Sequence, residues 1–307
     1  MNLQEIRAML RTVCAIPVTP FRTDGSADFE LFRQLVTRMV DGGIRVVTPN
    51  GNTSEFYSLT SVEHRRQLED ASVGVWNSRN QALVLAGVGF DAQTAIEMAD
   101  LAQTIGAQAV MVHQPVHPYR SDDGWIAYHK AIADAFPTLG VVPYVRDSSL
   151  SGATIKRLAE ACPNFVGIKY AVPNPPLFTK IVQEVGAERL AWICGLAESW
   201  APFFWVGGAQ GFTSGLVNLT THLSLEMQNA LEAGNYPRAM ALWAQVKPFE
   251  DLRARRDNAN NVSAVKEAMA QMGLCERTVR PPISELPEAE RAEVSQILKQ
   301  LISEPVA

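Results

Sequence analysis

The chain has 307 residues, of which 47% are hydrophobic and 19% charged, with a formal net charge of −5 and an isoelectric point of about 5.6. This length and apolar content suit one large α/β domain or two smaller ones. No basic stripe indicates nucleic-acid binding, and the N-terminus lacks the pattern of a signal peptide. The four cysteines are widely spaced without a Cys-x-x-Cys pair, which is typical of reduced thiols in a cytoplasmic protein rather than a metal site or disulfides.

Short apolar segments alternate along the chain with segments of helical periodicity. Most of these segments are apolar throughout, which is typical of strands covered on both faces of a parallel sheet. We predict strands at residues 13–18, 44–49, 82–87, 107–112, 140–144, 165–169, 190–194 and 211–215.

The segments between these strands carry helix signals. Apolar residues from Phe32 to Val40 recur on one helical face before Gly42 and Gly43. Thr60 and Glu63 have the spacing of a capping box, Asp91 is placed to cap the next helix, and Asn174 precedes a proline in the manner of an N-cap.

Eight strand–helix units within roughly 220 residues favour an α/β fold of the (β/α)8 TIM barrel type. A doubly wound sheet is the alternative, but no Gly-x-Gly-x-x-Gly follows an early strand. We therefore predict a barrel at residues 1–221 that carries the active site and a C-terminal helical extension at residues 222–307. The stretch 199–225 lacks Asp, Glu, Lys and Arg and is long enough to span a membrane, but its glycines and Pro202 favour a buried helix and strand.

In a barrel of this kind the active site lies at the C-terminal ends of the strands. Polar and reactive residues stand at six of the predicted ends, namely Gly51–Glu55, His113–Arg120, Tyr144–Asp147, Lys169, Gly195 and Ser214.

Lys169 follows the apolar run 165–168, where a buried ammonium is costly. Desolvation lowers the pKa of a lysine, and the neutral amine can attack a ketone to form a Schiff base. Tyr144, one strand away, is then the candidate proton shuttle. The alternatives are a lysine that extends to solvent from the strand end and a tyrosine that is only a rim aromatic.

His113 and His117 have the i, i+4 spacing of zinc ligands on a helix, but Pro115 and Pro118 forbid a regular helix there. We therefore favour a loop in which His117 makes a polar contact, with no metal. Glu55 is interpreted as an anchor for its own loop, and a catalytic acid is the alternative. The basic run 251–261 is interpreted as a solvated helix face.

The segments AIPVTPF, GNTSEFYSLT, GVVPYVRD, FVGIKYA and GAQGFTSGLVN together resemble the dihydrodipicolinate synthase / N-acetylneuraminate lyase superfamily. The resemblance runs from about residue 13 to the C-terminus. It implies that Lys169 is the Schiff-base lysine and that Tyr144 relays protons. Residues Gly51–Glu55 would bind the carboxylate of a 2-oxo acid, and the superfamily is often tetrameric and needs no metal for its chemistry.

The chain also departs from the superfamily pattern. Asn52 replaces a threonine that relays protons, and Ser54 replaces a glycine. The synthase branch has an arginine five residues after its tyrosine, where this chain has Ser149, and a tyrosine near the position of His117. Arg146, two residues after Tyr144, together with the late segment RPPISEL, resembles the 5-dehydro-4-deoxyglucarate dehydratase branch.

We therefore predict a Schiff-base lyase, an aldolase or dehydratase, that acts on pyruvate or a 2-oxo sugar acid without a cofactor. The predicted catalytic residues are Lys169 and Tyr144, and the predicted substrate contacts are Asn52, Thr53, Ser54, Arg146, His117, Gly195 and Ser214. The expected partners are a small-molecule 2-oxo acid and further copies of the chain in a homo-oligomer, dimer or tetramer, and neither nucleic acid nor membrane.

Four other functions remain open. A 4-hydroxy-tetrahydrodipicolinate synthase and a 2-keto-3-deoxy sugar-acid aldolase share the chemistry. A non-catalytic 2-oxo acid-binding homologue would keep the lysine without the proton relay, and a metal-dependent aldolase would be inactivated by a chelator.

Overall fold

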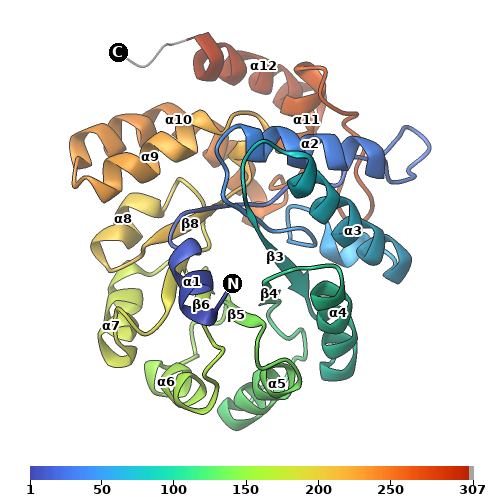
Figure 1. Ribbon diagram of the computed structural model, residues 1–307. Helices are drawn as coiled ribbons and strands as arrows, with labels where there is room; N and C mark the ends of the chain where they lie inside the picture. Colours follow the sequence, from blue (N-terminus) through green and yellow to red (C-terminus); the bar gives the residue numbers. More distant parts are fainter. Residues whose placement is uncertain (304–307) are drawn as a thin grey trace.

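The computed structural model describes residues 1–303, in which eight parallel strands pair in chain order and close into a barrel (Figure 1). The barrel closes because β8 pairs with β1, with Thr213 beside Cys14. Every predicted strand is present with shifted ends, so the predicted (β/α)8 fold is confirmed. The strands are β1 Val13–Ala15, β2 Val46–Val47, β3 Leu83–Val88, β4 Ala109–Val112, β5 Gly140–Val145, β6 Gly167–Tyr170, β7 Ala191–Cys194 and β8 Gly211–Ser214.

The helices between the strands form a ring around the barrel (Figure 1). They are α2 Phe29–Asp41, α3 Ser61–Asn77, α4 Ala92–Thr104, α5 Asp122–Ala135, α6 Gly152–Ala161, α7 Pro175–Val185 and α8 Ala201–Val206, and α9 His222–Glu232 follows β8. Helix α1, Leu3–Met9, lies across the near end of the barrel in Figure 1. Its Ile6 and the adjoining Leu10 pack with Cys14 in the barrel interior, so α1 closes the end opposite the strands' C-terminal ends.

The predicted helix starts are confirmed. Thr60 and Glu63 form the reciprocal hydrogen bonds of a capping box at the start of α3. Asp91 accepts a hydrogen bond from the Thr94 backbone at α4, and Asn174 caps α7 in the same way. The predicted apolar face of α2 is buried as well.

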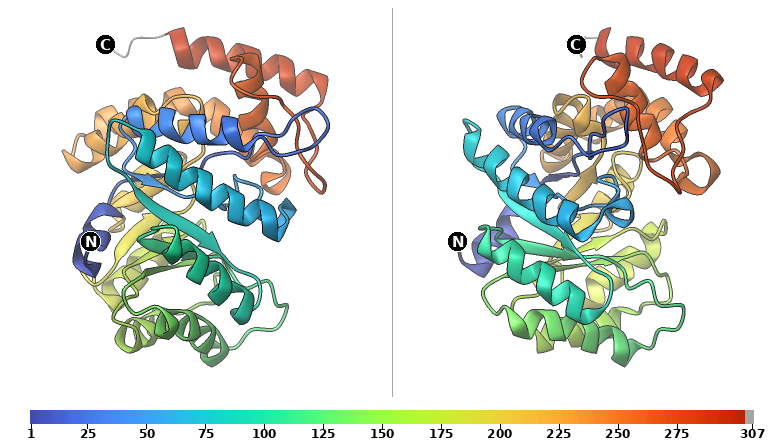
Figure 2. Two further views of the ribbon diagram at one scale, coloured as in Figure 1. Left: turned by 45° about the vertical axis from the view of Figure 1, so that its right-hand side comes forward. Right: turned by 90° about the vertical axis from the view of Figure 1, so that its right-hand side faces the viewer.

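After β8 the described chain is helical, as the predicted extension requires. It contains the short η2 helix Leu216–Asn218, then α9, α10 Tyr236–Asn258, α11 Ser263–Gln271 and α12 Glu288–Ser303. The predicted boundary at residue 221 falls just before α9, which packs beside β1. Figure 2 shows α12 on the outside of α10 and α11. Residues 304–307 of the predicted extension lie outside the described residues.

The interpretation of residues 251–261 as a solvated helix face holds only in part, because Asp251, Ala254 and residues 256–259 are exposed but the arginines of this run are paired. Arg253 is buried and its guanidinium lies 2.7 Å from Glu250. Arg255 and Arg256 pair with Glu293 and Glu290 of α12, each at 2.7 Å. The side chains of α12 therefore provide charges that the local sequence of α10 does not reveal.

The stretch 199–225, which lacks acidic and basic residues, forms α8, β8, η2 and the start of α9. Across residues 1–303, no helix has the length and apolar character needed to cross a membrane.

Candidate active site

Three side chains stand side by side at the C-terminal ends of β4, β5 and β6. Tyr144 is in register with Lys169, and Val112 is in register with Pro143, so His113 is level with Tyr144. The ammonium nitrogen of Lys169 lies 4.0 Å from the ring centroid of Tyr144. The rings of His113 and Tyr144 are 6.2 Å apart between centroids. Strand alternation turns all three inward, since Ile168 and Val112 belong to the outer core between strands and helices.

Lys169 is an unusually acidic lysine. Its side chain is buried, with 3% of its surface exposed. Its pKa is lowered to about 7, mainly by burial and to a lesser extent by the nearby Arg146, while the thiols of Cys14 and Cys194 act in the opposite direction. A carboxylate partner for Lys169 is absent from residues 1–303. A large fraction of this side chain is therefore the neutral, nucleophilic amine near pH 7.

Gly195 makes room for this lysine. A Cβ atom at position 195 would lie 3.0 Å from Lys169 Cγ and 2.8 Å from the Cβ atom of Ala171. The backbone N–H of Gly195 donates to the Tyr170 carbonyl at 2.7 Å. The structure thus places the predicted residue Gly195 directly against the lysine stem.

Tyr144 is a buried phenol. Burial raises its pKa, while Arg146 and hydrogen bonding by the Asn52 side chain oppose the rise. The Asn52 Oδ1 atom is itself buried and has no hydrogen-bond partner within the described chain. The amide of Asn52 therefore lies near the Tyr144 hydroxyl, and its Oδ1 atom remains available to accept a hydrogen bond.

Two further residues of the Gly51–Glu55 loop differ in their surroundings: Thr53 is buried, and Ser54 makes hydrogen bonds that hold the loop in place. Thr53 is buried at the C-terminal end of the barrel. The Ser54 hydroxyl donates to the Pro17 carbonyl at 2.6 Å, and the Ser54 carbonyl accepts from the Thr19 hydroxyl at 2.6 Å. Ser54 therefore fixes the loop to the segment after β1, and its hydroxyl is already occupied.

Glu55 anchors the loop in the way the sequence suggested, but with a charged partner as well. Its carboxylate is 2.5 Å from the ammonium of Lys266 on α11 and accepts from the Arg280 backbone N–H at 3.3 Å. Burial raises the pKa of Glu55, and Lys266 opposes the rise. This geometry favours the anchor over the catalytic acid.

Arg146 and His117 both lie at the surface. Arg146 is exposed, and its guanidinium has no carboxylate within ion-pair distance in residues 1–303. Burial raises the pKa values of Tyr144 and Tyr57, and the charge of Arg146 opposes the rise in both, so Arg146 lies near both phenols. His117 is exposed in the loop after β4, where its Nδ1 is 2.8 Å from the Tyr119 carbonyl oxygen. The structure does not bring His117 beside Lys169.

Ser214 faces away from the barrel interior. Its hydroxyl donates to Glu198 at 2.5 Å and lies 3.2 Å from the hydroxyl of Ser224 on α9. Side chains alternate along a strand, and Thr213 is the residue in register with the inward Cys14. The sequence prediction located the end of β8 but selected Ser214, which faces outward, instead of Thr213.

Sequence reasoning thus missed the inward residue Thr213 and the rim phenol Tyr57, and it considered the inward His113 only as a strand-end residue and a possible metal ligand. The period of two along β4 and β8 narrows the choice to alternate residues, but only the register with the neighbouring strands shows that Thr213 and His113 are the inward ones. Tyr57 lies in a short 3₁₀ helix, Phe56–Ser58, whose direction the sequence does not indicate.

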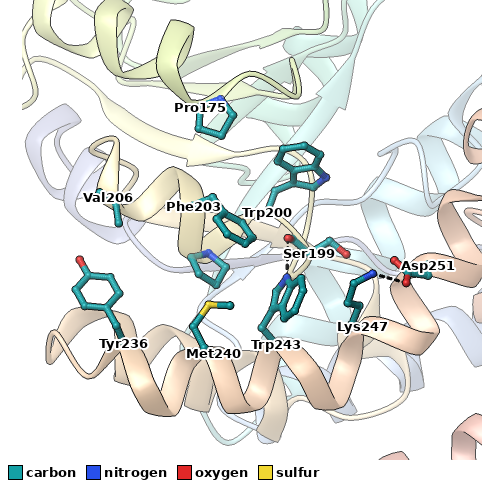
Figure 3. A pocket seen from close by; sticks show the side chains of 11 residues that line it. Pro175, Ser199, Trp200, Phe203, Val206, Tyr236, Met240, Trp243, Lys247 and Asp251 are labelled. Carbon is teal, nitrogen blue, oxygen red and sulfur yellow. Dashed lines mark hydrogen bonds and ion pairs between the residues drawn. The ribbon is translucent and has the colours of Figure 1, made fainter.

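An apolar groove of about 670 Å³ lies elsewhere, between α8 and α10 on the outside of the barrel (Figure 3). Trp200, Phe203 and Trp243 form its walls, and the Trp243 ring nitrogen donates to the Ser199 carbonyl at 2.9 Å. None of the predicted site residues lines it. Within residues 1–303 no group of three His, Cys, Asp or Glu side chains is placed to hold a metal ion.

Comparison with known proteins agrees with this geometry. A crystal structure of dihydrodipicolinate synthase from Bacillus clausii superposes with a TM-score of 0.92 at 40% identity, covering 96% of this chain and 98% of that one. A probable 5-dehydro-4-deoxyglucarate dehydratase from Bacillus subtilis (strain 168) is 30% identical, over 97% of this chain and 96% of the relative. The protein of the same name from Rhodococcus opacus (strain B4) is 31% identical, over 97% and 98%. The model of the dihydrodipicolinate synthetase family matches residues 9–301, and the chain belongs to that family.

Proposed function

We propose that the protein is a class I lyase that forms a Schiff base between Lys169 and a 2-oxo acid. The observation that carries the proposal is the buried amine of Lys169, whose pKa burial lowers to about 7, set 4.0 Å from the ring of Tyr144. An amine that is partly neutral at physiological pH is a nucleophile, and the phenol beside it is a proton donor.

The chemistry follows from these two groups. The neutral amine attacks the 2-carbonyl carbon, and the carbinolamine loses water to give a protonated imine. The imine draws electrons from C3, so C3 loses a proton to form an enamine. The enamine then expels the hydroxyl group of C4, which leaves as water after it takes up a proton. Burial keeps Tyr144 protonated, so it is suited to donate a proton to a departing oxygen and to recover it afterwards.

Among substrates, we favour a hydroxylated 2-oxo sugar diacid, as in 5-dehydro-4-deoxyglucarate dehydratase. The curated relatives with that name support this choice, whereas the Bacillus clausii structure bears the synthase name. The synthase arginine is replaced by Ser149, whose hydroxyl accepts from Arg120 at 2.6 Å. Arg120 is already paired with Asp147 and Asp122, whereas Arg146 is exposed beside Tyr144 and free of ion pairs in residues 1–303.

We assign the remaining predicted contacts accordingly. Asn52 and Thr53 would hold the 2-oxo carboxylate, with Ser54 supporting their loop. Arg146 would pair with the distal carboxylate. We assign His117, Gly195 and Ser214 no direct contact. His117 is exposed and bonded within its own loop, the backbone N–H of Gly195 already donates to Tyr170, and Ser214 is bonded to Glu198.

The test compares substrates and an Arg146→Lys variant. Wild-type protein should turn over 5-dehydro-4-deoxyglucarate far better than it condenses pyruvate with aspartate semialdehyde. Arg146→Lys should raise KM for the diacid about 10-fold or more, because a point charge does not reproduce a bidentate pair, and should change little for a monoacid. Arg157→Lys, at an exposed pair with Asp123, is the matched control.

Borohydride reduction with pyruvate should also attach the reduced ligand to Lys169, as mass spectrometry of peptides would show. Efficient condensation with aspartate semialdehyde would restore the synthase alternative. Release of pyruvate and an aldehyde from a 2-keto-3-deoxy sugar acid would point to an aldolase. An adduct without exchange of the pyruvate methyl protons would point to a non-catalytic binder.

We further propose that the protein is cytoplasmic and homo-oligomeric, and that it works without a metal. The four free cysteines, three of them buried, support a reducing compartment. Light scattering after size-exclusion chromatography would measure the oligomer, and activity that survives EDTA would remove the metal-dependent alternative.

A further inference from the structure

His113 is a buried histidine that the proposed reaction does not use, although it stands level with Tyr144 and Lys169. It is the first residue after β4, and 1% of its surface is exposed. Its ring stacks on Phe56 at 4.0 Å between centroids and meets Tyr144 edge-on at 6.2 Å. The imidazole thus fills the space between the loop after β2 and the candidate proton donor.

The tautomer of His113 is fixed by its one hydrogen bond. Nε2 lies 2.8 Å from the backbone carbonyl oxygen of Asn50. A carbonyl oxygen only accepts, so Nε2 carries the proton and Nδ1 is the bare nitrogen. Nδ1 is buried and has no partner among the described residues. Burial lowers the pKa of His113 to about 3, so the neutral form persists at physiological pH.

The Asn50 carbonyl reaches His113 through a costly local arrangement. Asn50 has a φ of 57°, in the left-handed region that non-glycine residues seldom adopt. Its backbone N–H donates to Gln67 Oε1 at 2.6 Å. Its carbonyl crosses Gly87 on β3, where a Cβ atom would lie 2.0 Å from the oxygen. Strain of this kind persists only where several neighbours enforce it, and it is concentrated at functional sites.

Asn50 immediately precedes the loop that carries Asn52. The hydrogen bond of His113 to the Asn50 carbonyl therefore positions the start of this loop. The ring of His113 also contacts the ring of Tyr144, whose pKa is raised by burial against the opposing effect of hydrogen bonding with Asn52. We propose that His113 is a positioning residue: its Nε2–H holds the Asn50 carbonyl and thereby sets Asn52 at the correct distance from Tyr144. The inference rests on the proposed function for its kinetic consequences, but the loop geometry can be tested without activity.

Two substitutions separate the hydrogen bond from packing. His113→Phe keeps an aromatic ring but removes the donor, so kcat/KM for the sugar diacid should fall roughly 10- to 100-fold, the scale of a small misplacement of reacting groups. His113→Gln places an amide N–H near the Nε2 position and should recover much of this loss. Trapping of pyruvate on Lys169 at saturating concentration should survive in both variants.

His64→Phe is the matched control. His64 is also buried beside Phe56, at 4.6 Å between centroids, and neither of its ring nitrogens has a partner in the described residues. Its ring does not hold the loop, so this variant should remain near wild-type kinetics.

Hydrogen exchange provides the readout that needs no substrate. Amides of residues 50–55 should exchange faster in His113→Phe than in wild type, with α7 unchanged as an internal reference. If wild-type protein neither traps nor turns over a 2-oxo acid, the proposed function fails. The exchange measurement still tests whether the hydrogen bond from His113 to the Asn50 carbonyl holds the loop. Wild-type exchange in His113→Phe, or equal kinetic damage from His64→Phe, would overturn the inference.

Discussion

Lys169 owes its lowered pKa to its whole environment rather than to a single partner. Its amine is enclosed by the barrel interior, with Gly195 against its stem and the Tyr144 ring 4.0 Å from its nitrogen. Burial is the largest influence on its pKa, and a positive charge on Arg146 acts in the same direction. The pKa of Lys169 therefore lies near 7 although no side chain beside it in residues 1–303 acts as its base.

This pKa predicts how imine formation depends on pH. The neutral amine is the nucleophile, so the rate of pyruvate trapping at low concentration should rise about 10-fold per pH unit below 7 and level off above it. Arg146→Gln removes a neighbouring positive charge, so the pKa of Lys169 should rise and the plateau should begin at higher pH. Borohydride trapping across pH 5 to 9 would measure both. A wild-type rate that still climbs about 10-fold between pH 8 and pH 9 would contradict a depressed pKa.

The residues that could be predicted were those whose position along a strand determines their role. An apolar run that ends in lysine, and a tyrosine at the end of the preceding strand, are enough to indicate Lys169 and Tyr144 as neighbours. Ser214 could not be placed, because short strands leave the inward or outward phase open until the register is known. His113 looked like half of a metal pair, and only its contact with Asn50 indicates another role.

At the level of elements, Glu198 joins three segments through one buried carboxyl group. It follows β7, and its Oε1 accepts from Ser214 on β8 and Ser224 on α9, each at 2.5 Å. Its Oε2 has no partner in the described chain. Burial, and then the nearby Glu250, raise its pKa to about 7. The junction is therefore most stable with a neutral acid at this position.

The stability of this junction should depend on pH. The folded-state pKa lies above that of an unfolded glutamate, so its contribution is fully present below about pH 4 and is lost as the pH rises through 7. Glu198→Gln stays neutral, so its free energy of unfolding should exceed that of wild type by on the order of 3 kcal/mol at pH 8, with a smaller gap at pH 5. Urea titrations at both pH values would measure this, with Glu188→Gln as an exposed control. An equal gap at both pH values would exclude titration of Glu198 as the cause.

Helix caps were readable because each depends on residues a few positions apart, and strand order was readable because consecutive strands of a (β/α)8 barrel are neighbours. The predicted boundary at residue 221 stays a prediction, since α9 follows it and yet packs beside β1 in the helical ring. The ion pairs between α10 and α12 could not be read at all, because their partners lie more than thirty residues apart, as Arg256 and Glu290 do. Local pattern therefore predicted the barrel better than the attachment of its extension.

Across the whole molecule, the C-terminal extension reaches the candidate active site through one buried ion pair. Lys266 on α11 and Glu55 at the end of the Gly51–Glu55 loop are both fully buried, and Lys266 also donates to the Thr278 carbonyl at 2.9 Å. Its ammonium lies 4.0 Å from the ring centroid of Phe21, and the Arg280 guanidinium is 4.2 Å from the same ring. The extension thus supports the Gly51–Glu55 loop from behind.

This arrangement predicts a strongly non-additive pair of substitutions. Lys266→Met leaves the Glu55 carboxylate buried without its cation, so the free energy of unfolding should fall by about 3–5 kcal/mol, and Glu55→Gln alone should also destabilise by stranding the ammonium. The double variant removes both charges at similar volume and should be far more stable than the sum of the single losses implies. Its KM for the sugar diacid should nevertheless increase, because the loop has lost a fixed anchor. Urea unfolding of all four proteins, with kinetics on the double variant, would measure both effects. Additive losses would mean that Glu55 and Lys266 act independently and that the extension does not hold the loop through them.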